Sequence, residues 1–413
     1  MQERPSNSET EPRRGITGAK RYPLIVIALA VLSHGGYSLS GQGFTPFYPF
    51  IRDDFALTNT QIGFITGAIF GAATLTSAGF GWALDRFGTR ILSGALLVLS
   101  GLVVASLYFA SSFVLILVVA AAMGSLRPVG HPAGAKMIVD WIAPLRRGTA
   151  MSIKQAGNPA LGALAAAAVP PIAIAFGWRV AAVALGIFIA LAGAAILAFY
   201  RDRYPVSGRQ GERTSFFAGM GRVMRNRDIS LAIVFGFPLV GSQVAMLTYF
   251  ILFLNDELGV PVVVAGGLLA VLQVSNIVMR IGWGVISDTL SGGRRKPVLL
   301  VSSLATAGMI LVMALLPDGT PTWALVLVAI GLGGTVTSWV SVHSTLLAEL
   351  SGPTQVGTTL GYASTVQRAS IVLAPPLFGL VADTAGCQVA WLGMVGTMLM
   401  GIAFLFPVRE RRS

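Results

Sequence analysis

The sequence predicts an all-α membrane protein with twelve transmembrane helices in two six-helix bundles and both termini in the cytoplasm. Of the 413 residues, 54% are hydrophobic and only 11% are charged, whereas about a quarter of the residues in a soluble domain are charged. A helix that spans a bilayer needs about 20 mostly apolar residues, and apolar stretches of that length recur along the whole chain. This composition excludes a soluble fold.

The first apolar stretch covers residues 23–50 and follows a polar N-terminal tail, residues 1–22. It is longer than the core of a signal peptide and lacks a convincing cleavage site, so we expect a retained first span. Its glycines, the Gly35-Gly36 pair and Gly41, can either break the helix or form a close-packing surface. Eleven further spans are predicted at residues 60–84, 91–110, 113–142, 148–176, 180–200, 229–254, 262–287, 297–316, 322–348, 356–382 and 388–408.

The longest polar interruption, residues 201–228, is a predicted central loop that separates the spans into two groups of six. We therefore expect one bundle over residues 23–200, a second over 229–408 and a short tail over 409–413. Cytoplasmic loops of membrane proteins collect Lys and Arg. Of the 29 such residues, 22 lie in the tails and in alternate loops on one side, and 2 lie in the loops on the other. The basic side is therefore predicted to be cytoplasmic.

The two predicted bundles carry related loop sequences. Residues 81–90 read Gly-Trp-Ala-Leu-Asp-Arg-Phe-Gly-Thr-Arg, and residues 284–288 read Gly-Val-Ile-Ser-Asp, followed by a basic cluster. The spacing from Gly to Asp is four in both copies, which are 203 residues apart. Internal repeats displaced by half the chain are typical of membrane transporters.

Residues 81–90 resemble the loop motif of the major facilitator superfamily, G-x-x-x-D-R-x-G-R-R, and the twelve spans and central loop match that superfamily over nearly the whole chain. The resemblance implies its fold and alternating access by two bundles. A glycine permits close helix approach, and the motif's Asp can accept hydrogen bonds from an arginine or a helix N-terminus. We expect a cytoplasmic latch, the alternative being a solvated turn, and the candidate gating residues are Gly81, Asp85, Arg86, Gly88, Arg90 and Asp288.

Five Lys and Arg residues fall inside predicted spans: Arg127, Lys136, Lys154, Arg280 and Arg368. A charge at membrane depth costs at least ~2.5 kcal/mol and usually faces a bundle interior or an aqueous cavity. No carboxylate is predicted at comparable depth. A cavity lined by Arg and Lys suits an anion, which Arg can bind with its planar fork and Lys with a point charge.

Two resemblances refine this site. Arg127 is similar to the fourth-helix arginine of the superfamily, although the glycine spacing after it departs from the usual pattern. The placement of Arg280 and Arg368 on the eighth and eleventh spans is similar to that of the paired cations of oxalate and monocarboxylate carriers. The candidate substrate-binding residues are Arg280, Arg368, Arg127, Lys154, His34, Tyr37, Gln243 and Asn276.

Each cation also has a structural interpretation. Arg127 can bond to backbone carbonyls, Lys154 and Arg280 can pair with inner-loop carboxylates such as Asp85 or Asp288, and Lys136 can extend to the membrane interface.

Other functional classes lack support in the sequence. The net charge of +12 is dispersed between apolar runs, which disfavours nucleic-acid binding. The histidines are isolated, the single cysteine is Cys387, and no Walker-type phosphate loop is present, so we expect no metal, no cofactor and no enzymatic activity.

The sequence thus predicts a monomeric secondary transporter in the inner or plasma membrane that takes up a small organic anion, with a carboxylate as the favoured class. A proton is the candidate co-substrate, and His34 is its candidate carrier. The alternative is a proton-coupled exporter of an amphiphilic drug or metabolite, because residues 157–162, Gly-Asn-Pro-Ala-Leu-Gly, partly resemble the fifth-helix motif of antiporters.

Overall fold

The computed structural model describes residues 22–203, 225–289, 291, 294–351 and 356–410, and within these ranges the chain is helical, with no strand. Most of the predicted N-terminal tail and central loop, and the end of the C-terminal tail, lie outside the described residues. The helices are α1 (Tyr22–Leu39), η1 (Gln42–Phe47), α2 (Tyr48–Phe55), α3 (Asn59–Phe87), α4 (Thr89–Ala105), η2 (Ser106–Phe109), α5 (Phe113–Leu126), η3 (Arg127–Val129), α6 (Gly130–Trp141), η4 (Pro144–Arg146), α7 (Arg147–Phe176), α8 (Trp178–Phe199), α10 (Arg227–Asp256), α11 (Val262–Thr289), α12 (Arg295–Ala314), α13 (Thr322–Thr335), α14 (Val340–Ser351), α15 (Val356–Ala385) and α16 (Cys387–Leu405).

Eleven helical segments in this part of the chain are long and apolar enough to cross a membrane. Each corresponds to one predicted span, and two of them contain two α-helices each, α5 with α6 and α13 with α14. The remaining predicted span, residues 60–84, forms the 29-residue helix α3, which is not among those eleven. The fold is therefore all-helical and multi-pass.

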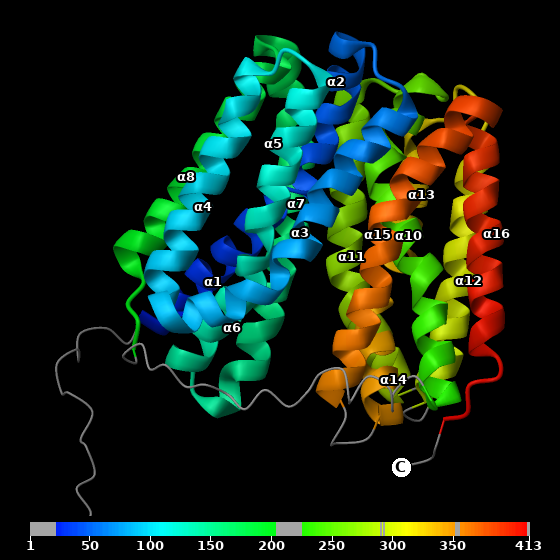
Figure 1. Cartoon of the computed structure of the whole chain (residues 1–413). Coiled ribbons are helices and arrows are strands. Elements are labelled where there is room, and N and C mark those ends of the chain that lie inside the picture. Colours follow the sequence, from blue (N-terminus) through cyan, green and yellow to red (C-terminus); the bar gives the residue numbers. More distant parts are fainter. Residues whose placement is uncertain (1–21, 204–224, 290, 292–293, 352–355, 411–413) are drawn as a thin grey trace, which may run out of the picture.

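The helices form two groups that follow the order of the chain. Figure 1 shows α1 to α8, coloured blue to green, on one side and α10 to α16, coloured green to red, on the other. The two groups, called here the N-terminal and C-terminal halves, touch where α3 packs on α15 and where α7 packs on α11. These contacts are close because a Cβ on Gly63 would lie 2.5 Å from the carbonyl oxygen of Pro375, and a Cβ on Gly266 would lie 2.4 Å from that of Ala166.

The first apolar stretch is interrupted as well as tightly packed. Helix α1 ends at Leu39, and the amide of Gly41 then donates to the carbonyl oxygen of Ser38 at 2.9 Å in a tight turn. Earlier in α1, a Cβ on Gly35 would lie 2.6 Å from the carbonyl oxygen of Gly157 on α7. The glycines thus serve both of the roles that the sequence allows: Gly41 lies at the break and Gly35 in a helix contact.

Local sequence fixes both ends of α3. At its start, Thr58 and Gln61 form a capping box in which the Gln61 amide donates to Thr58 Oγ1 at 3.2 Å and the Thr58 amide donates to Gln61 Oε1 at 2.9 Å, a pattern that satisfies the free donors of a helix N-terminus. At its end, Gly88 has φ of +81°. Only glycine adopts such a backbone without strain, so the turn into α4 depends on this residue.

Two predicted spans are broken in corresponding positions of the two halves. The fourth is interrupted at η3, where Pro128 lacks an amide donor, and the tenth at residues 336–339. Such breaks leave backbone groups free in the middle of a span, where they are tolerated only inside the protein or beside a cavity. Interrupted helices mark the binding region in many membrane transporters.

Candidate functional site

Four cations lie on four different segments of the two halves. Arg127 lies in η3, Lys154 on α7, Arg280 on α11 and Arg368 on α15. Arg127, Lys154 and Arg280 all lie near enough to exert an electrostatic effect on the ring of His34. Arg368 acts in the same way on Arg127. We call these four residues the cation cluster.

Arg127 is held by an aromatic ring and by the backbone at the α1 break. Its guanidinium carbon lies 4.5 Å from the centroid of the Phe70 ring on α3, within the range of a cation–π interaction. A Cβ on Gly41 would lie 3.1 Å from Nε of Arg127, so the arginine fills the space beside that break. No hydrogen bond from Arg127 to a backbone carbonyl is present in the part of the chain described.

Arg368 links the two halves directly. Its Nη1 donates a hydrogen bond of 2.5 Å to the hydroxyl oxygen of Ser77 on α3. This bond uses one of the five donor hydrogens of the guanidinium. The partner is neutral, so the charge of Arg368 remains uncompensated at this contact.

Arg280 lies at the interruption of the tenth span. Its Nη2 donates to the carbonyl oxygen of Thr337 at 3.4 Å, a group left free by the break between α13 and α14. Its Nε is buried and has no hydrogen-bond partner among the residues described. Most of the donor capacity of this guanidinium is therefore unused.

Lys154 is almost completely buried, with 1% of its side chain surface exposed. Its Nζ donates to the carbonyl oxygen of His131 at 3.3 Å. The ring of His131 lies edge-on to the ring of His34, with 5.4 Å between the centroids. Lys154 and the two histidines thus form one group on the N-terminal side of the site.

None of the four cations forms an ion pair with a carboxylate whose side chain the structure describes. The ion pairs in these ranges lie near helix ends, for example Arg179 with Asp54 at 2.9 Å and Arg295 with Glu349 at 3.1 Å. The side chain of Asp85 lies outside the described residues, so its pairing with Lys154 or Arg280 stays an expectation.

The predicted neutral residues have different environments. The hydroxyl of Tyr37 donates to the carbonyl oxygen of Ser93 at 2.8 Å inside the N-terminal half and is fully committed there. Gln243 is partly buried on α10 and has no side-chain hydrogen bond within the described ranges. Asn276 is buried on α11, and its Oδ1 likewise has no described partner. Asn276 is therefore the neutral candidate that carries a buried, unpaired polar atom.

Gln273 is a further site residue that the sequence reasoning missed. Its Nε2 donates to Oε1 of Gln42 at 2.9 Å, which joins α11 to η1 across the two halves. The signal was present in the sequence, because Gln273, Asn276 and Arg280 are spaced as i, i+3 and i+7, and residues with this spacing share one face of a helix.

Five of the six predicted gating residues lie around the turn between α3 and α4, and the sixth, Asp288, lies near the end of α11. The Nε of Arg90 donates to the carbonyl oxygen of Leu197 at 2.7 Å, and the carboxylate of Asp202 accepts the amide of Thr89 at 2.9 Å. These bonds hold the start of α4 against the end of α8, within the N-terminal half.

The other members of the motif give less information. Arg86 is exposed, and its guanidinium carbon lies 6.0 Å from the centroid of the Phe87 ring. The side chains of Asp85 and Asp288 and the surroundings of Gly81 are not among the described features, so the latch between Asp85 and Arg90 stays a prediction.

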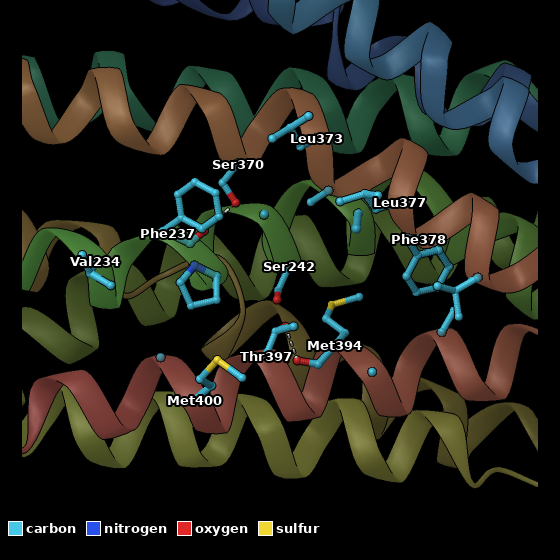
Figure 2. Close-up of a pocket in the computed structure, with 18 of the residues that line it drawn as sticks. Val234, Phe237, Ser242, Ser370, Leu373, Leu377, Phe378, Met394, Thr397 and Met400 are labelled. Carbon is cyan, nitrogen blue, oxygen red and sulfur yellow. Dashed lines mark hydrogen bonds between the residues drawn. The ribbon is translucent and has the colours of Figure 1, made fainter.

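A separate pocket lies on the C-terminal half. It has a volume of about 610 Å³ and is lined by α10, α15 and α16. Figure 2 shows its apolar walls, which include Phe237, Leu377 and Met400. Its Ser370 hydroxyl is already bonded to the carbonyl oxygen of Phe237 at 2.6 Å. The pocket contains no member of the cation cluster and suits hydrocarbon rather than an anion.

Comparison with known proteins identifies the family. Residues 30–346 and 293–413 match the sequence model of the Major Facilitator Superfamily. An uncharacterised MFS-type transporter of Mycobacterium tuberculosis, Rv2994, is 25% identical over 395 residues, which cover 94% of this chain and 85% of the relative. The hexuronate transporter of Bacillus subtilis is 22% identical over 352 residues, which cover 82% and 83% of the two chains.

Solved structures show the same fold. A bacterial homologue of the human lysosomal transporter Spinster, in an inward-facing and occupied conformation, superposes with a TM-score of 0.80 at 16% identity and covers 96% of this chain and 100% of that one. The family match spans both halves and includes both interrupted spans. This chain therefore belongs to the major facilitator superfamily of multi-pass membrane transporters.

Proposed function

We propose that this protein is a secondary transporter that moves a small organic anion, with a carboxylate as the favoured class, by alternating access. The observation that carries the proposal is the cation cluster, whose members form no ion pair with a carboxylate described in the structure. A charge buried without a partner is costly. An anion that enters between the two halves provides the missing countercharge, and the guanidinium groups match a carboxylate in shape.

The relatives support the anionic class. The Bacillus subtilis relative is a hexuronate transporter, and a hexuronate is a sugar that carries a carboxylate. That relative and this chain correspond over most of both lengths, so the proposal does not depend on a single shared motif.

We further propose that α3 is a twelfth span, that both termini are cytoplasmic, and that the described state faces inward. The contacts between the halves support this assignment. Near the predicted outer ends, Arg52 pairs with Asp256, and the hydroxyl of Tyr249 donates to the carbonyl oxygen of Asn59 at 2.7 Å. Farther inward along α3, the described bonds between the halves join Thr66 to Thr248 and Arg368 to Ser77. Because the described bonds lie toward the outer ends and the middle of the spans, we assign the outer side as the closed one.

Counterflow in proteoliposomes tests the proposed function. Labelled glucuronate is the anionic probe, with glucose and glucosamine as neutral and cationic controls of similar size. We expect exchange of glucuronate alone. Preference for the cation or the neutral sugar would contradict the anionic class.

The direction of transport needs a separate measurement. Right-side-out vesicles receive an inward proton gradient and inside-out vesicles an outward one, which reproduces the proton gradient of the cell in each orientation. Uptake with protons predicts accumulation in the right-side-out vesicles when the gradient is imposed. Gradient-driven accumulation only in the inside-out vesicles, whose interior is acidic, would favour the exporter.

A further inference from the structure

Three buried polar atoms on α11 have no hydrogen-bond partner among the residues described: Oε1 of Gln273, Oδ1 of Asn276 and Nε of Arg280. Gln273 and Asn276 are 2% and 4% exposed. Buried polar atoms nearly always have a partner. Three unpaired atoms on one helix therefore indicate that a bound ligand supplies their hydrogen-bond partners.

The three residues form one continuous stripe. Their spacing of three and then four residues places them on the same face of α11. Seven residues of an α-helix rise about 10 Å, so the stripe reaches from Gln273 to Arg280 over the length of a small organic acid.

Contacts with α13 and with the other half orient the two ends of the stripe. The hydroxyl of Ser275 donates to the carbonyl oxygen of Ile330 at 2.7 Å, which turns Gln273, two residues earlier, away from α13. The bond from Gln273 to Gln42 shows that this end meets the N-terminal half. Trp283, three residues after Arg280, donates from Nε1 to the carbonyl oxygen of Gly334 at 2.6 Å, so the Arg280 end lies beside α13.

The chemistry of the stripe is mixed. Arg280 is a cation with an unused donor, and it belongs to the cation cluster. Gln273 and Asn276 are neutral amides. The oxygen and nitrogen of an amide can be assigned either way round. If both the Gln42 and the Gln273 amides are flipped, the Gln42 nitrogen donates to the Gln273 oxygen, and the unpaired atom of Gln273 is then its nitrogen, a donor instead of an acceptor. A hydroxyl group satisfies both arrangements, because it donates and accepts.

We infer that the substrate is a hydroxylated organic anion, whose acidic group binds Arg280 and whose hydroxyl groups bind Asn276 and Gln273. The inference rests on the proposed function. A plain alkyl carboxylate would leave both amides unpaired, and a site built to hydrogen-bond a hydroxyl discriminates strongly against an analogue that lacks it. An ammonium-bearing ligand could satisfy an acceptor but would be repelled by the cluster. Because the three atoms are shielded from water in this state, binding includes a side-chain rotation or a movement of the halves that exposes them.

The test compares matched ligands by isothermal titration calorimetry on the purified full-length protein. Gluconate and hexanoate have six carbons and one carboxylate each, and glycerate and propionate form a smaller pair. We expect the hydroxylated member of at least one pair to bind at least about tenfold tighter than its partner, since lost hydrogen bonds to paired groups have effects of this order or larger.

Variants assign the effect to residues. Gln273→Met and Asn276→Leu should each weaken the hydroxylated anion by about tenfold, the order expected for one lost hydrogen bond, and leave its plain partner unchanged. Arg280→Gln should weaken both members of the pair. Ser303→Ala is the matched control, because Ser303 Oγ is also buried without a described partner but lies on α12; its affinities should equal those of the wild type.

The outcomes separate the two claims. Equal affinity for both members of each pair in the wild type, together with weaker binding by Arg280→Gln, would overturn the hydroxyl inference and leave anion transport intact. Binding of no anion, or anion binding that Arg280→Gln leaves unchanged, would overturn the role of the stripe altogether, and the counterflow assay with glucuronate would then decide the proposed function independently. The wild-type comparison requires no substitution, so a variant that fails to fold leaves the inference falsifiable.

Discussion

Asp383, near the end of α15, accepts two hydrogen bonds from Thr60, one from the amide at 2.8 Å and one from the hydroxyl at 2.6 Å. Asp383 also accepts the amide of Asn59 at 2.9 Å. A carboxylate of the C-terminal half thus caps the first turn of α3 in the N-terminal half. Free amides at a helix N-terminus carry a partial positive charge, so this contact stabilises the state in which these ends touch.

Asp383→Asn should therefore shift the conformational equilibrium toward the state with the outer ends apart. The interaction of a carboxylate with a helix N-terminus stabilises by about 0.3–2 kcal/mol, so we expect a change of up to about thirtyfold in the ratio of the two states. Spin labels at Ser111 and Thr322, in a protein with Cys387→Ser, would report the distance between the outer ends. Asp318→Asn, which removes an exposed outer acid, is the control and should leave the distance distribution unchanged.

The ion pair between Arg52 and Asp256 should act at the same end. The hydrogen bond from Arg52 to Asp256 raises the pKa of the Arg52 guanidinium. The positive charge is therefore lost only above the ordinary pKa of arginine, and the pair keeps its cation throughout the working pH range. Arg52→Gln should favour the outer-open state by about 0.5–1 kcal/mol at low salt. The exchanged pair, Arg52→Asp with Asp256→Arg, should restore the wild-type distances, and failure to do so would show that the effect is not electrostatic.

Arg368 is expected to bind the substrate carboxylate. Arg368→Gln should weaken anion binding by ~2–5 kcal/mol, the range for removing one partner of a buried hydrogen-bonded charge pair. Arg368→Lys should rescue poorly, since it keeps the charge and loses the planar fork. Ser77→Ala removes only the anchoring hydroxyl and should have a smaller effect. Calorimetry with glucuronate, alongside thermal unfolding, checks all three, and normal affinity in Arg368→Gln would exclude substrate contact.

His34 is expected to carry the co-transported proton. Histidine exchanges protons in the physiological range, and Lys154, Arg127 and Arg280 act electrostatically on this ring. An anion that offsets their field would favour a charged ring, which couples the two binding events. His34→Gln should abolish proton-driven accumulation in vesicles while counterflow continues. His131→Gln is the neighbouring control, and undiminished accumulation in His34→Gln would exclude the assignment.

Asp85 is expected to stabilise the state with the cytoplasmic side closed. Asp85→Asn should slow counterflow without lowering anion affinity or the unfolding temperature, because it biases the conformational equilibrium and not the site. Asp288→Asn should have a weaker effect, since the second copy of the motif is degenerate. Wild-type turnover in Asp85→Asn would contradict the latch.

The sequence predicted the membrane class and the location of the spans, because crossing hydrocarbon requires long apolar helices whatever their neighbours are. It also identified Arg127, Lys154, Arg280 and Arg368 as unusual, because the cost of a charge at membrane depth is a property of position along a span. Gly41 signalled a local break through its own backbone chemistry, whereas the break at Pro128 was found only in the structure.

The sequence alone could not determine which groups meet. Arg368 and Ser77 are 291 residues apart and Gln273 and Gln42 are 231 apart, and both contacts depend on how whole helices are rotated and packed. Gln273 is recognised as a site residue only from the structure, because the packing of α11 on α13 places its amide beside the other half. Local sequence therefore determined the helices and the charges that they carry, whereas the tertiary structure decided the pairing, because contacts between distant helices depend on the packing of all their neighbours.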